Sequence, residues 1–284
     1  MKAAVLGSPI AHSLSPVLHR AAYAALGLDD WSYAAIECAE DGLAALVARL
    51  GPEWAGLSLT MPLKRTVLPL LRHVDPVAAA TGGANTVVFR PDGRYGYNTD
   101  VRGSVAALGE AGAPAGGVPL RNVTIVGGGA TACSARAAVR ELGVSTAHVV
   151  VRDPNRALGL LDAAGRLGVR VQFRAFGQLE DRDRDADAPA DLLISTVPAG
   201  AADAYAARVR ATGHAPAAIL DVVYSPWPTE LAVACAEAGS IVVSGFAMLL
   251  HQAAAQVELM TGKPAPLEAM RAAGEAELAR RMAG

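Results

Sequence analysis

The chain has 284 residues, of which 52% are hydrophobic and 18% charged, a composition typical of packed globular proteins rather than disordered ones. Its 25 Lys and Arg residues against 27 Asp and Glu give a net charge of −2, so no basic excess indicates a nucleic-acid or membrane partner. Three widely separated cysteines without a CxxC motif argue against a disulfide framework or a zinc site, and no apolar run reaches the length of about 18 residues that a membrane span needs.

Short apolar runs alternate with longer Ala- and Leu-rich stretches along most of the chain. This alternation predicts βαβ units around mostly parallel sheets, and therefore an α/β fold. The expected strands cover residues 3–6, 32–36, 56–59, 86–89, 123–126, 147–151, 169–173, 192–195, 218–222 and 240–243. The expected helices cover residues 16–26, 41–50, 63–71, 101–111, 131–142, 155–166, 229–237 and 246–260.

The loop between the first strand and the first helix, GSPIAHSLSP, carries two hydroxyls two residues apart, Ser13 and Ser15. Ser15 precedes Pro16, a pair that commonly starts a helix, so its hydroxyl has a structural alternative as an N-cap. Ser13 has no such alternative and is a candidate ligand contact. We interpret His12 and His19 as structural histidines.

Polar residues follow the next strands of the same half of the chain. Lys64 ends the segment SLTMPLK, directly after the strand at 56–59, in a chain that has only two other lysines. This position favours a role in proton transfer. Asn85 in GGANT and Asp100 in GYNTD flank a pair of apolar segments. Asp100 could instead cap the helix that follows it, and this alternative remains open.

A stretch rich in Gly, Pro and Ala at residues 111–119 predicts a domain boundary. The strand after it leads directly into VGGGATA, which fits the pattern G-x-G-x-x-A at Gly127, Gly129 and Ala132. Gly127 would make a tight turn, Gly129 would let the backbone approach a pyrophosphate, and Ala132 would let helix and strand pack. Because a strand precedes the glycines and a helix follows them, a dinucleotide-binding unit is favoured over an ordinary glycine turn.

The end of the next predicted strand, VVVRDPNR, bears on which dinucleotide binds. Arg152 and Arg156 suit the extra phosphate of NADP, whereas an acidic residue such as Asp153 would accept the ribose hydroxyls of NAD. Asp153 followed by Pro154 is also a typical helix start, so we expect the aspartate to cap a helix and the arginines to favour NADP. The charged segment at 180–190 is interpreted as a solvated surface loop.

Seven motifs occur in order along the chain: GSPIAHSLSPVLH, LTMPLK, GGANT, GYNTDVRG, VGGGATA, DVVYSPWPTEL and GFAMLLHQAAAQ. The series resembles the shikimate dehydrogenases and their quinate/shikimate relatives. The resemblance implies NADP-dependent, reversible reduction of 3-dehydroshikimate to shikimate in chorismate and aromatic amino-acid biosynthesis. It also implies an α/β protein of two domains: a substrate domain of residues 1–102 and 244–284, completed by C-terminal helices, and a Rossmann-like NADP-binding domain of residues 103–243.

The resemblance also assigns roles to individual residues, motif by motif, and it implies no metal. Lys64 and Asp100 would be the catalytic pair. The implied substrate contacts are Ser13 and Ser15 at the carboxylate, Thr60, Asn85 and Gln252 at the hydroxyls, Lys64 and Asp100 themselves, and Tyr224. The implied cofactor contacts are Gly127, Gly128, Gly129, Ala130, Thr131, Ala132, Arg152, Arg156, Thr196, Val222, Gly245 and Met248.

The chain departs from the family pattern at two positions. Ser58 stands where the family usually has Asn, which alters a contact behind the substrate site but leaves Lys64 in place. Asp153 stands where the family usually has Thr, although the pair of arginines around it is retained. NADP therefore remains the expected cofactor.

Three alternatives to an NADP-dependent shikimate dehydrogenase remain. The nearest is a quinate/shikimate dehydrogenase that uses NAD, and an aminoshikimate-type homologue is another. The third is a non-catalytic NADP-binding regulator on the same fold. Serine at both Ser13 and Ser15 favours shikimate, and the presence of both Lys64 and Asp100 argues against a regulator. We expect a cytoplasmic enzyme, monomer or homodimer, with a small-molecule substrate and neither nucleic acid nor membrane as partner.

Overall fold

The computed structural model describes residues 1–113, 120–175 and 190–283. The chain forms two compact units: Met1–Gly103 with Leu250–Gly284, here called the terminal unit, and Ser104–Leu249, here called the central unit. The chain passes between them within α5 (Thr99–Glu110) and again within α10 (Gly245–Thr261). Among the described residues, no helix has both the length and the apolar character that crossing a membrane requires.

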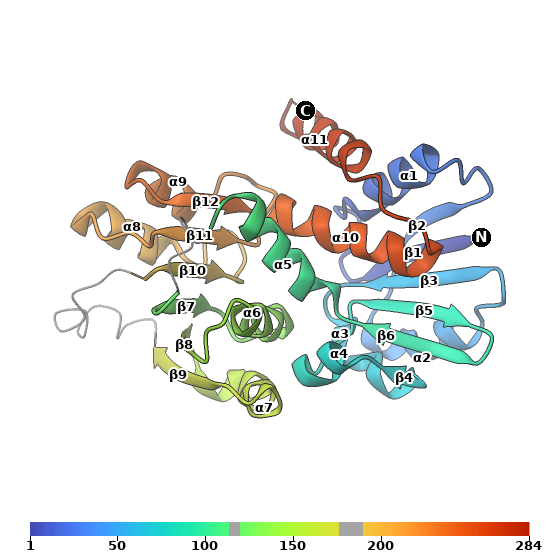
Figure 1. Cartoon of the computed structure of the whole chain (residues 1–284), viewed down its shortest axis with the longest axis horizontal. Coiled ribbons are helices and arrows are strands. Elements are labelled where there is room, and N and C mark those ends of the chain that lie inside the picture. Colours follow the sequence, from blue (N-terminus) through green and yellow to red (C-terminus); the bar gives the residue numbers. More distant parts are fainter. Residues whose placement is uncertain (114–119, 176–189, 284) are drawn as a thin grey trace. The chain divides into compact units, whose positions relative to one another are not determined.

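The terminal unit is built on a mixed six-stranded sheet in the order β2-β1-β3-β5-β6-β4 (Figure 1). The three strands β2, β1 and β3 are parallel, and β5 then runs antiparallel to both of its neighbours. The strands are β1 (Lys2–Gly7), β2 (Ser32–Glu37), β3 (Trp54–Leu59), β4 (His73–Val74), β5 (Thr86–Arg90) and β6 (Gly93–Tyr97).

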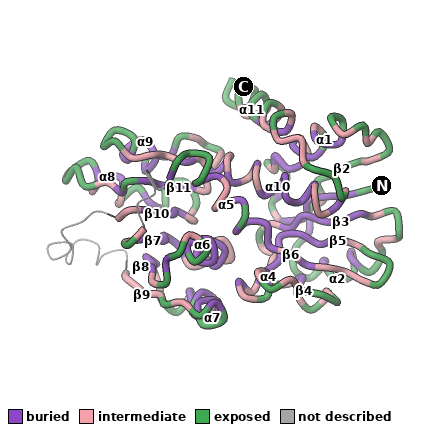
Figure 2. The backbone as a smooth tube through the Cα atoms, viewed as in Figure 1, coloured by how far each residue is buried: buried purple, intermediate pink, exposed green. Residues whose placement is uncertain are grey.

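Helices cover both faces of this sheet. Successive side chains of a strand point to opposite faces, so each strand contributes to two hydrophobic cores, one under each layer of helices. Ala4 and Leu6 of β1 pack with residues of α2 and α3, whereas Ala3 and Val5 pack with residues of α1 and α10. Figure 2 shows β1 and β3 as buried along most of their length. The helices are α1 (Ser15–Ala25), α2 (Glu40–Ala48), α3 (Leu63–Thr66), α4 (Pro76–Thr81) and α11 (Leu267–Ala283), which packs on α1.

The central unit has a parallel six-stranded sheet in the order β12-β11-β10-β7-β8-β9. Numbered within the unit, this order is 6-5-4-1-2-3, which is the doubly wound arrangement of dinucleotide-binding folds. The strands are β7 (Val123–Val126), β8 (Thr146–Val151), β9 (Arg170–Ala175), β10 (Leu192–Ser195), β11 (Ala218–Asp221) and β12 (Ile241–Ser244).

Helices also cover both faces of the central sheet. Leu192 and Ile194 of β10 belong to the core formed with α6 and α7, whereas Leu193 between them belongs to the core formed with α8 and α9. The helices are α6 (Ala130–Glu141), α7 (Leu158–Leu167), α8 (Asp203–Thr212) and α9 (Glu230–Glu237).

The predicted α/β fold with two domains is confirmed, but some elements differ from the prediction. The structure adds β4, β6, α4, α8 and α11, and it shortens the helix expected at 63–71. That helix ends at Thr66 and a 3₁₀ turn follows at Leu68–Leu70. Pro69 explains the difference, because its ring has no N–H to donate and clashes with the preceding turn of an α-helix.

His19 on α1 has no exposed surface and stacks on Tyr33, with the two ring centroids 4.0 Å apart. Its Nδ1 donates a hydrogen bond to the carbonyl oxygen of Ser15 at 2.9 Å, because a carbonyl oxygen can only accept. The other ring nitrogen, Nε2, is buried and has no hydrogen-bond partner among the described residues. Burial without a partner for a second proton lowers the pKa of His19 to about 4. The interpretation of His19 as a structural histidine fits this environment.

We predict that His19 makes folding stability depend on pH. Its pKa is about 4 in the folded protein and 6.5 in the unfolded chain, so between these values only the unfolded chain takes up the proton. The free energy of unfolding should therefore fall by about 1.4 kcal/mol per pH unit as the pH decreases from 6.5 towards 4. Urea unfolding at a series of pH values measures this slope. His19→Gln should flatten it and His12→Gln, at an exposed position, should not; equal slopes in all three proteins would refute the assignment.

Candidate active site

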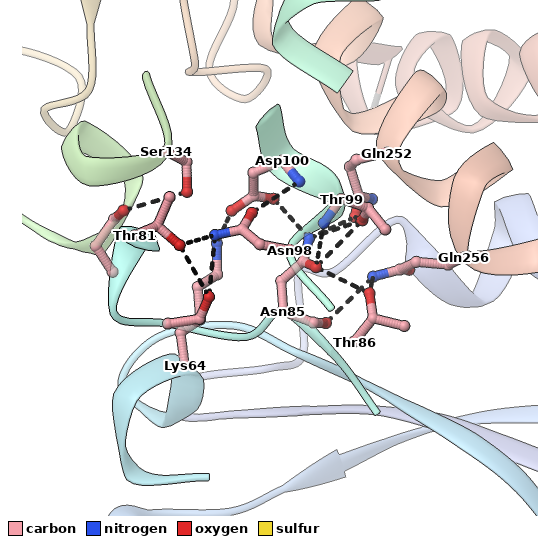
Figure 3. Close-up of polar contacts among 12 residues, drawn as sticks. Lys64, Thr81, Asn85, Thr86, Asn98, Thr99, Asp100, Ser134, Gln252 and Gln256 are labelled. Atoms are coloured by element: carbon pink, nitrogen blue, oxygen red, sulfur yellow. Dashed lines mark hydrogen bonds and ion pairs between the residues drawn. The ribbon is translucent and has the colours of Figure 1, made fainter. Parts of the chain in front are cut away.

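Lys64 and Asp100 form an ion pair in the terminal unit, with Lys64 Nζ 2.5 Å from Asp100 Oδ2 (Figure 3). Their side chains are 14% and 6% exposed, so the pair is largely withdrawn from solvent. Lys64 lies on α3, which begins just after β3, and Asp100 lies in the first turn of α5, which begins just after β6. Removing either partner would leave the other charge poorly compensated.

The alternative that Asp100 only caps α5 is not supported by the contacts. Asn98 precedes the helix, and its Oδ1 accepts from the backbone N–H of Asp100 at 3.1 Å, which is the bond expected of a cap. The carboxylate of Asp100 instead accepts from Lys64 and, through Oδ1, from Asn85 Nδ2 at 2.7 Å. Its charge is therefore directed into the site.

Asn85 lies at the centre of the site and is 2% exposed. Its Oδ1 accepts from the backbone N–H of Thr99 at 2.8 Å and from the hydroxyl of Thr86 at 2.8 Å. Its Nδ2 lies 2.9 Å from Thr99 Oγ1 and 3.3 Å from Gln252 Oε1. The structure thus brings Lys64, Asn85, Asp100 and Gln252 together, although Gln252 comes from α10, far away in the sequence (Figure 3).

The opening loop lies between β1 and α1 in the same unit. Ser15 is the first residue of α1 and Leu14 is its N-cap, without a side-chain capping bond, so the structure does not support the alternative that Ser15 is an N-cap. The backbone N–H of Ser15 instead donates to Ser13 Oγ at 3.3 Å, which places the two serines side by side. Arg281 on α11 supports the loop by donating to the carbonyl oxygen of His12 at 2.7 Å.

Thr60 lies beside this loop, at the end of β3. Its backbone N–H donates to the carbonyl oxygen of Leu6 at 2.9 Å. Its methyl group occupies the space where a Cβ atom on Gly7 would stand. Glycine at position 7 therefore lets the polar end of β3 lie directly against the start of the serine loop.

The glycine loop of the central unit forms one wall of a pocket with a volume of about 330 Å³. Gly127 has φ +115°, a conformation that glycine tolerates far better than other residues, and a Cβ there would collide with Thr196 Oγ1. Gly129 is exposed, and a Cβ built on it meets no atom within 4 Å, so its backbone faces open space at the start of α6. Gly128 also lines the pocket, Ala130 and Thr131 begin the helix, and Ala132 is buried in the core.

Val151, Arg152, Asp153 and Ala157 line the same pocket, and Val151 and Ala157 lie directly beside Gly128. Asp153 caps the 3₁₀ turn Pro154–Ala157, since its Oδ1 accepts from the backbone N–H of Asn155 at 2.9 Å. The predicted helix start is thus confirmed, and Arg152 is exposed at the pocket. The side chain of Arg156 lies outside the described residues.

The remaining predicted cofactor and substrate residues also lie in the central unit. The hydroxyl of Thr196 donates to the carbonyl oxygen of Val126 at 2.8 Å, where it abuts the glycine loop. Gly245 packs its backbone against that of Val222 so closely that no Cβ would fit. Met248 is 7% exposed and packs in the core with α6.

Tyr224 lies in the segment between β11 and α9 and is partly buried. Asp221 at the start of this segment accepts from the hydroxyl of Thr229 at 2.7 Å and from the backbone N–H of Val223 at 3.2 Å. One carboxylate thus fixes both ends of the segment that carries Tyr224. Burial raises the pKa of Asp221, and these hydrogen bonds oppose that rise.

The polar network of the terminal unit is completed by three residues that were not predicted as site residues: Thr86, Thr99 and Gln256 (Figure 3). A signal for Gln256 was available, because it follows Gln252 by four residues and such residues share one helix face. The network offers a cation, a carboxylate and amide groups to a ligand that carries hydroxyls or a carbonyl. No cluster of three or more side chains suited to a metal ion occurs in the described ranges.

Comparisons with known proteins agree on one family. The family model of the shikimate dehydrogenase substrate binding domain matches residues 5–87 of the sequence. The family model of the shikimate 5'-dehydrogenase C-terminal domain matches residues 245–273. The curated shikimate dehydrogenase (NADP(+)) of Halorubrum lacusprofundi is 36% identical, over 96% of this chain and 98% of that protein.

Solved structures give the same result. The crystal structure of Mycobacterium tuberculosis shikimate dehydrogenase matches with a TM-score of 0.84 and 45% identity, covering 96% of this chain and 99% of that one. The Thermus thermophilus enzyme, solved in complex with NADP(H) and shikimate, matches with a TM-score of 0.79 and 32% identity, covering 97% and 99%. Similarity at this level over nearly the full length of both proteins confirms the resemblance drawn from the motifs, and the chain belongs to the shikimate dehydrogenase family.

Proposed function

We propose that this protein is an NADP-dependent shikimate dehydrogenase, which reversibly reduces 3-dehydroshikimate to shikimate on the route to chorismate and the aromatic amino acids. The observation that carries the proposal is the ion pair of Lys64 and Asp100, joined to Asn85 in one buried network. Membership of the family and the NADP named for its curated relatives support the reaction and the cofactor. The alternative of an NAD-dependent quinate dehydrogenase has less support.

The central unit fits NADP by its own geometry. The exposed backbone of Gly129 at the start of α6 leaves room for a pyrophosphate, and the N–H groups of that helix end favour an anion. Arg152 lines the same pocket, where a guanidinium suits a phosphate on the ribose. We assign the remaining predicted cofactor contacts, Gly127, Gly128, Ala130, Thr131, Ala132, Arg156, Thr196, Val222, Gly245 and Met248, to the same role.

When NADPH is bound, its nicotinamide supplies the hydride for the ketone. Negative charge then develops on the substrate oxygen, and the ammonium of Lys64 stabilises this charge and donates a proton to it. Asp100 holds the ammonium in place through its contact of 2.5 Å and shares the substrate hydroxyl. In the direction of oxidation, the same pair accepts the proton from the hydroxyl of shikimate.

The other polar residues of the site would bind and orient the substrate. We propose that Ser13 and Ser15 donate to its carboxylate, and that Thr60, Asn85 and Gln252 hold its hydroxyls. Tyr224 is proposed as a further contact at the carboxylate end. The terminal unit would then be the substrate domain and the central unit the NADP domain, with a small molecule as the partner and the cytoplasm as the location.

An absorbance assay at the nicotinamide band tests the proposal. Shikimate and quinate are each combined with NADP and with NAD, which gives four reactions. Shikimate with NADP should give the highest kcat/KM. Faster oxidation of quinate with NAD would favour the quinate-type alternative, and no turnover in any combination would favour a regulator.

We predict that Ser13→Ala and Ser15→Ala each raise the KM for shikimate by about 10-fold, as expected for the loss of a hydrogen bond to a charged group. The KM for NADP should stay nearly constant because both serines belong to the terminal unit, whereas the glycine loop belongs to the central unit. Steady-state kinetics with each substrate varied in turn gives both constants. An unchanged KM for shikimate in both variants would remove the serines from the carboxylate site.

A further inference from the structure

A continuous run of buried hydrogen bonds leads through the terminal unit to Asn85. Tyr33 Oη lies 2.6 Å from Ser58 Oγ, and Ser58 Oγ lies 2.7 Å from Gln256 Oε1. Gln256 Nε2 lies 3.2 Å from the carbonyl oxygen of Asn85 and 3.0 Å from Thr86 Oγ1. Thr86 Oγ1 in turn lies 2.8 Å from Asn85 Oδ1. These five residues are between 0% and 3% exposed, so water does not compete for the bonds.

Chemistry fixes the direction of every bond in this run. The carbonyl oxygen of Asn85 can only accept, so the amide nitrogen of Gln256 must face it. Oε1 of Gln256 then faces Ser58, which must donate its single hydroxyl proton there and accept from Tyr33. The second amide proton of Gln256 goes to Thr86, whose own proton is left to donate to Asn85 Oδ1.

The last bond determines how Asn85 presents its side chain (Figure 3). With Oδ1 held by Thr86 and by the backbone N–H of Thr99, Nδ2 must point to Asp100 Oδ1, which lies 2.7 Å away. The reversed amide would place an acceptor against that carboxylate oxygen and would lose both donors to Oδ1. The hydroxyl of Thr86 thus favours the orientation that suits an ionised Asp100.

We propose that Gln256 and Thr86 are positioning residues for the dehydrogenase reaction, because they fix the orientation of the Asn85 amide beside the catalytic pair. The proposal rests on the function proposed above. The proposal also gives Ser58 a role. The hydroxyl of Ser58 donates to Gln256 Oε1, and this bond orients the amide of the glutamine.

The test compares three threonine variants. Thr86→Val keeps the shape of the side chain and suits β5 but removes the hydroxyl, whereas Thr86→Ser keeps the hydroxyl and removes the methyl group. Thr124→Val makes the same exchange at a buried position of β7 in the central unit and serves as the matched control. We expect Thr86→Val to lower kcat/KM for shikimate by ~5- to 10-fold, about what the loss of one hydrogen bond gives, with an unchanged KM for NADP. Thr86→Ser and Thr124→Val should remain within about two-fold of the parent.

Gln256→Met tests the same series of hydrogen bonds at a second residue. Methionine has a similar volume to glutamine but lacks the amide that bonds to Ser58, Asn85 and Thr86. This variant should lower kcat/KM as Thr86→Val does, and the double variant should lose less than the product of the two single effects, because both act through Asn85. Parental kcat/KM in Thr86→Val, or an equal loss in Thr86→Ser, would overturn the proposal, since packing rather than the hydroxyl would then matter.

A crystal structure of Thr86→Val tests the positioning independently of activity. We expect the separation of Asn85 Nδ2 and Asp100 Oδ1, 2.7 Å in the parent, to lengthen. An Asn85 side chain that stays in place would overturn the proposal even if the parent enzyme oxidises shikimate. If the parent turns over none of the four substrate and cofactor pairs, the proposed function fails, and the displacement of Asn85 still decides the orienting role.

Discussion

Lys64→Ala should lower kcat for shikimate oxidation by ~10²-fold or more, with a much smaller change in KM. The ammonium is 2.5 Å from Asp100 and 14% exposed, so in the proposed reaction it would act on the developing oxygen charge in a site with little water to screen it. That charge exists in the transition state rather than in bound shikimate, which is why turnover suffers more than binding. Turnover within a few-fold of the parent would show that Lys64 is not the catalytic cation.

Three controls separate catalysis from folding. Lys263→Ala removes one of the two other lysines, at an exposed position, and should leave both kinetic constants unchanged. An unchanged KM for NADP in Lys64→Ala would show that the central unit is intact. Circular dichroism should show the parental helix content, because the substitution leaves an aspartate without its cation but still bonded to Asn85.

Asp100→Asn should also reduce kcat, because the variant no longer supplies a charge to hold the ammonium. If Asp100 acts by orienting Lys64, the double variant should lose less than the product of the two single losses. Strictly multiplicative losses would mean that the two residues act independently. The cycle measures the coupling directly, whereas either single variant also reports the cost of an unpaired charge.

The individual chemical groups of the site could be predicted from the sequence, but their connections could not. Lys64, Asn85 and Asp100 each stand in a short motif beside a strand end, where local rules place polar side chains together. Gln256 and Ser58 are 198 positions apart, and no local pattern joins them. Their contact depends on α10 packing across the sheet, which is a property of the folded chain.

The fold shows the same division between local and tertiary information. The glycine loop and its flanking strand and helix were predictable because positive φ, apolar runs and Ala-rich stretches are local signals. The strand β6, with the sequence GRYGY, was missed because its glycines weaken the strand pattern. The strand forms because its backbone pairs with β5 along its whole length. Glycine at position 96 leaves room for the side chain of Leu71, which a Cβ atom there would displace.

Arg152→Ala should raise the KM for NADP by ~10-fold or more, corresponding to at least ~1.4 kcal/mol, and leave the KM for NAD nearly unchanged. Arg152 follows β8 directly and is exposed at the wall of the pocket that the glycine loop completes. A guanidinium there can bind a ribose phosphate with two charge-assisted hydrogen bonds, which the hydroxyl of NAD cannot replace. Arg121→Ala, another exposed arginine of the central unit, is the matched control and should change neither constant.

We expect Asp153 to reduce the preference for NADP. Its Oδ1 accepts from the N–H of Asn155, so the carboxylate is engaged in starting its own turn while its charge remains in the pocket wall. Asp153→Asn keeps the capping oxygen and removes the charge, because asparagine is an equally good N-cap. This variant should therefore increase the ratio of kcat/KM for NADP to that for NAD, and added salt should reduce the difference between variant and parent by screening. Equal kcat/KM values for the two cofactors in the parent enzyme would refute the role of Arg152 and favour the quinate-type alternative.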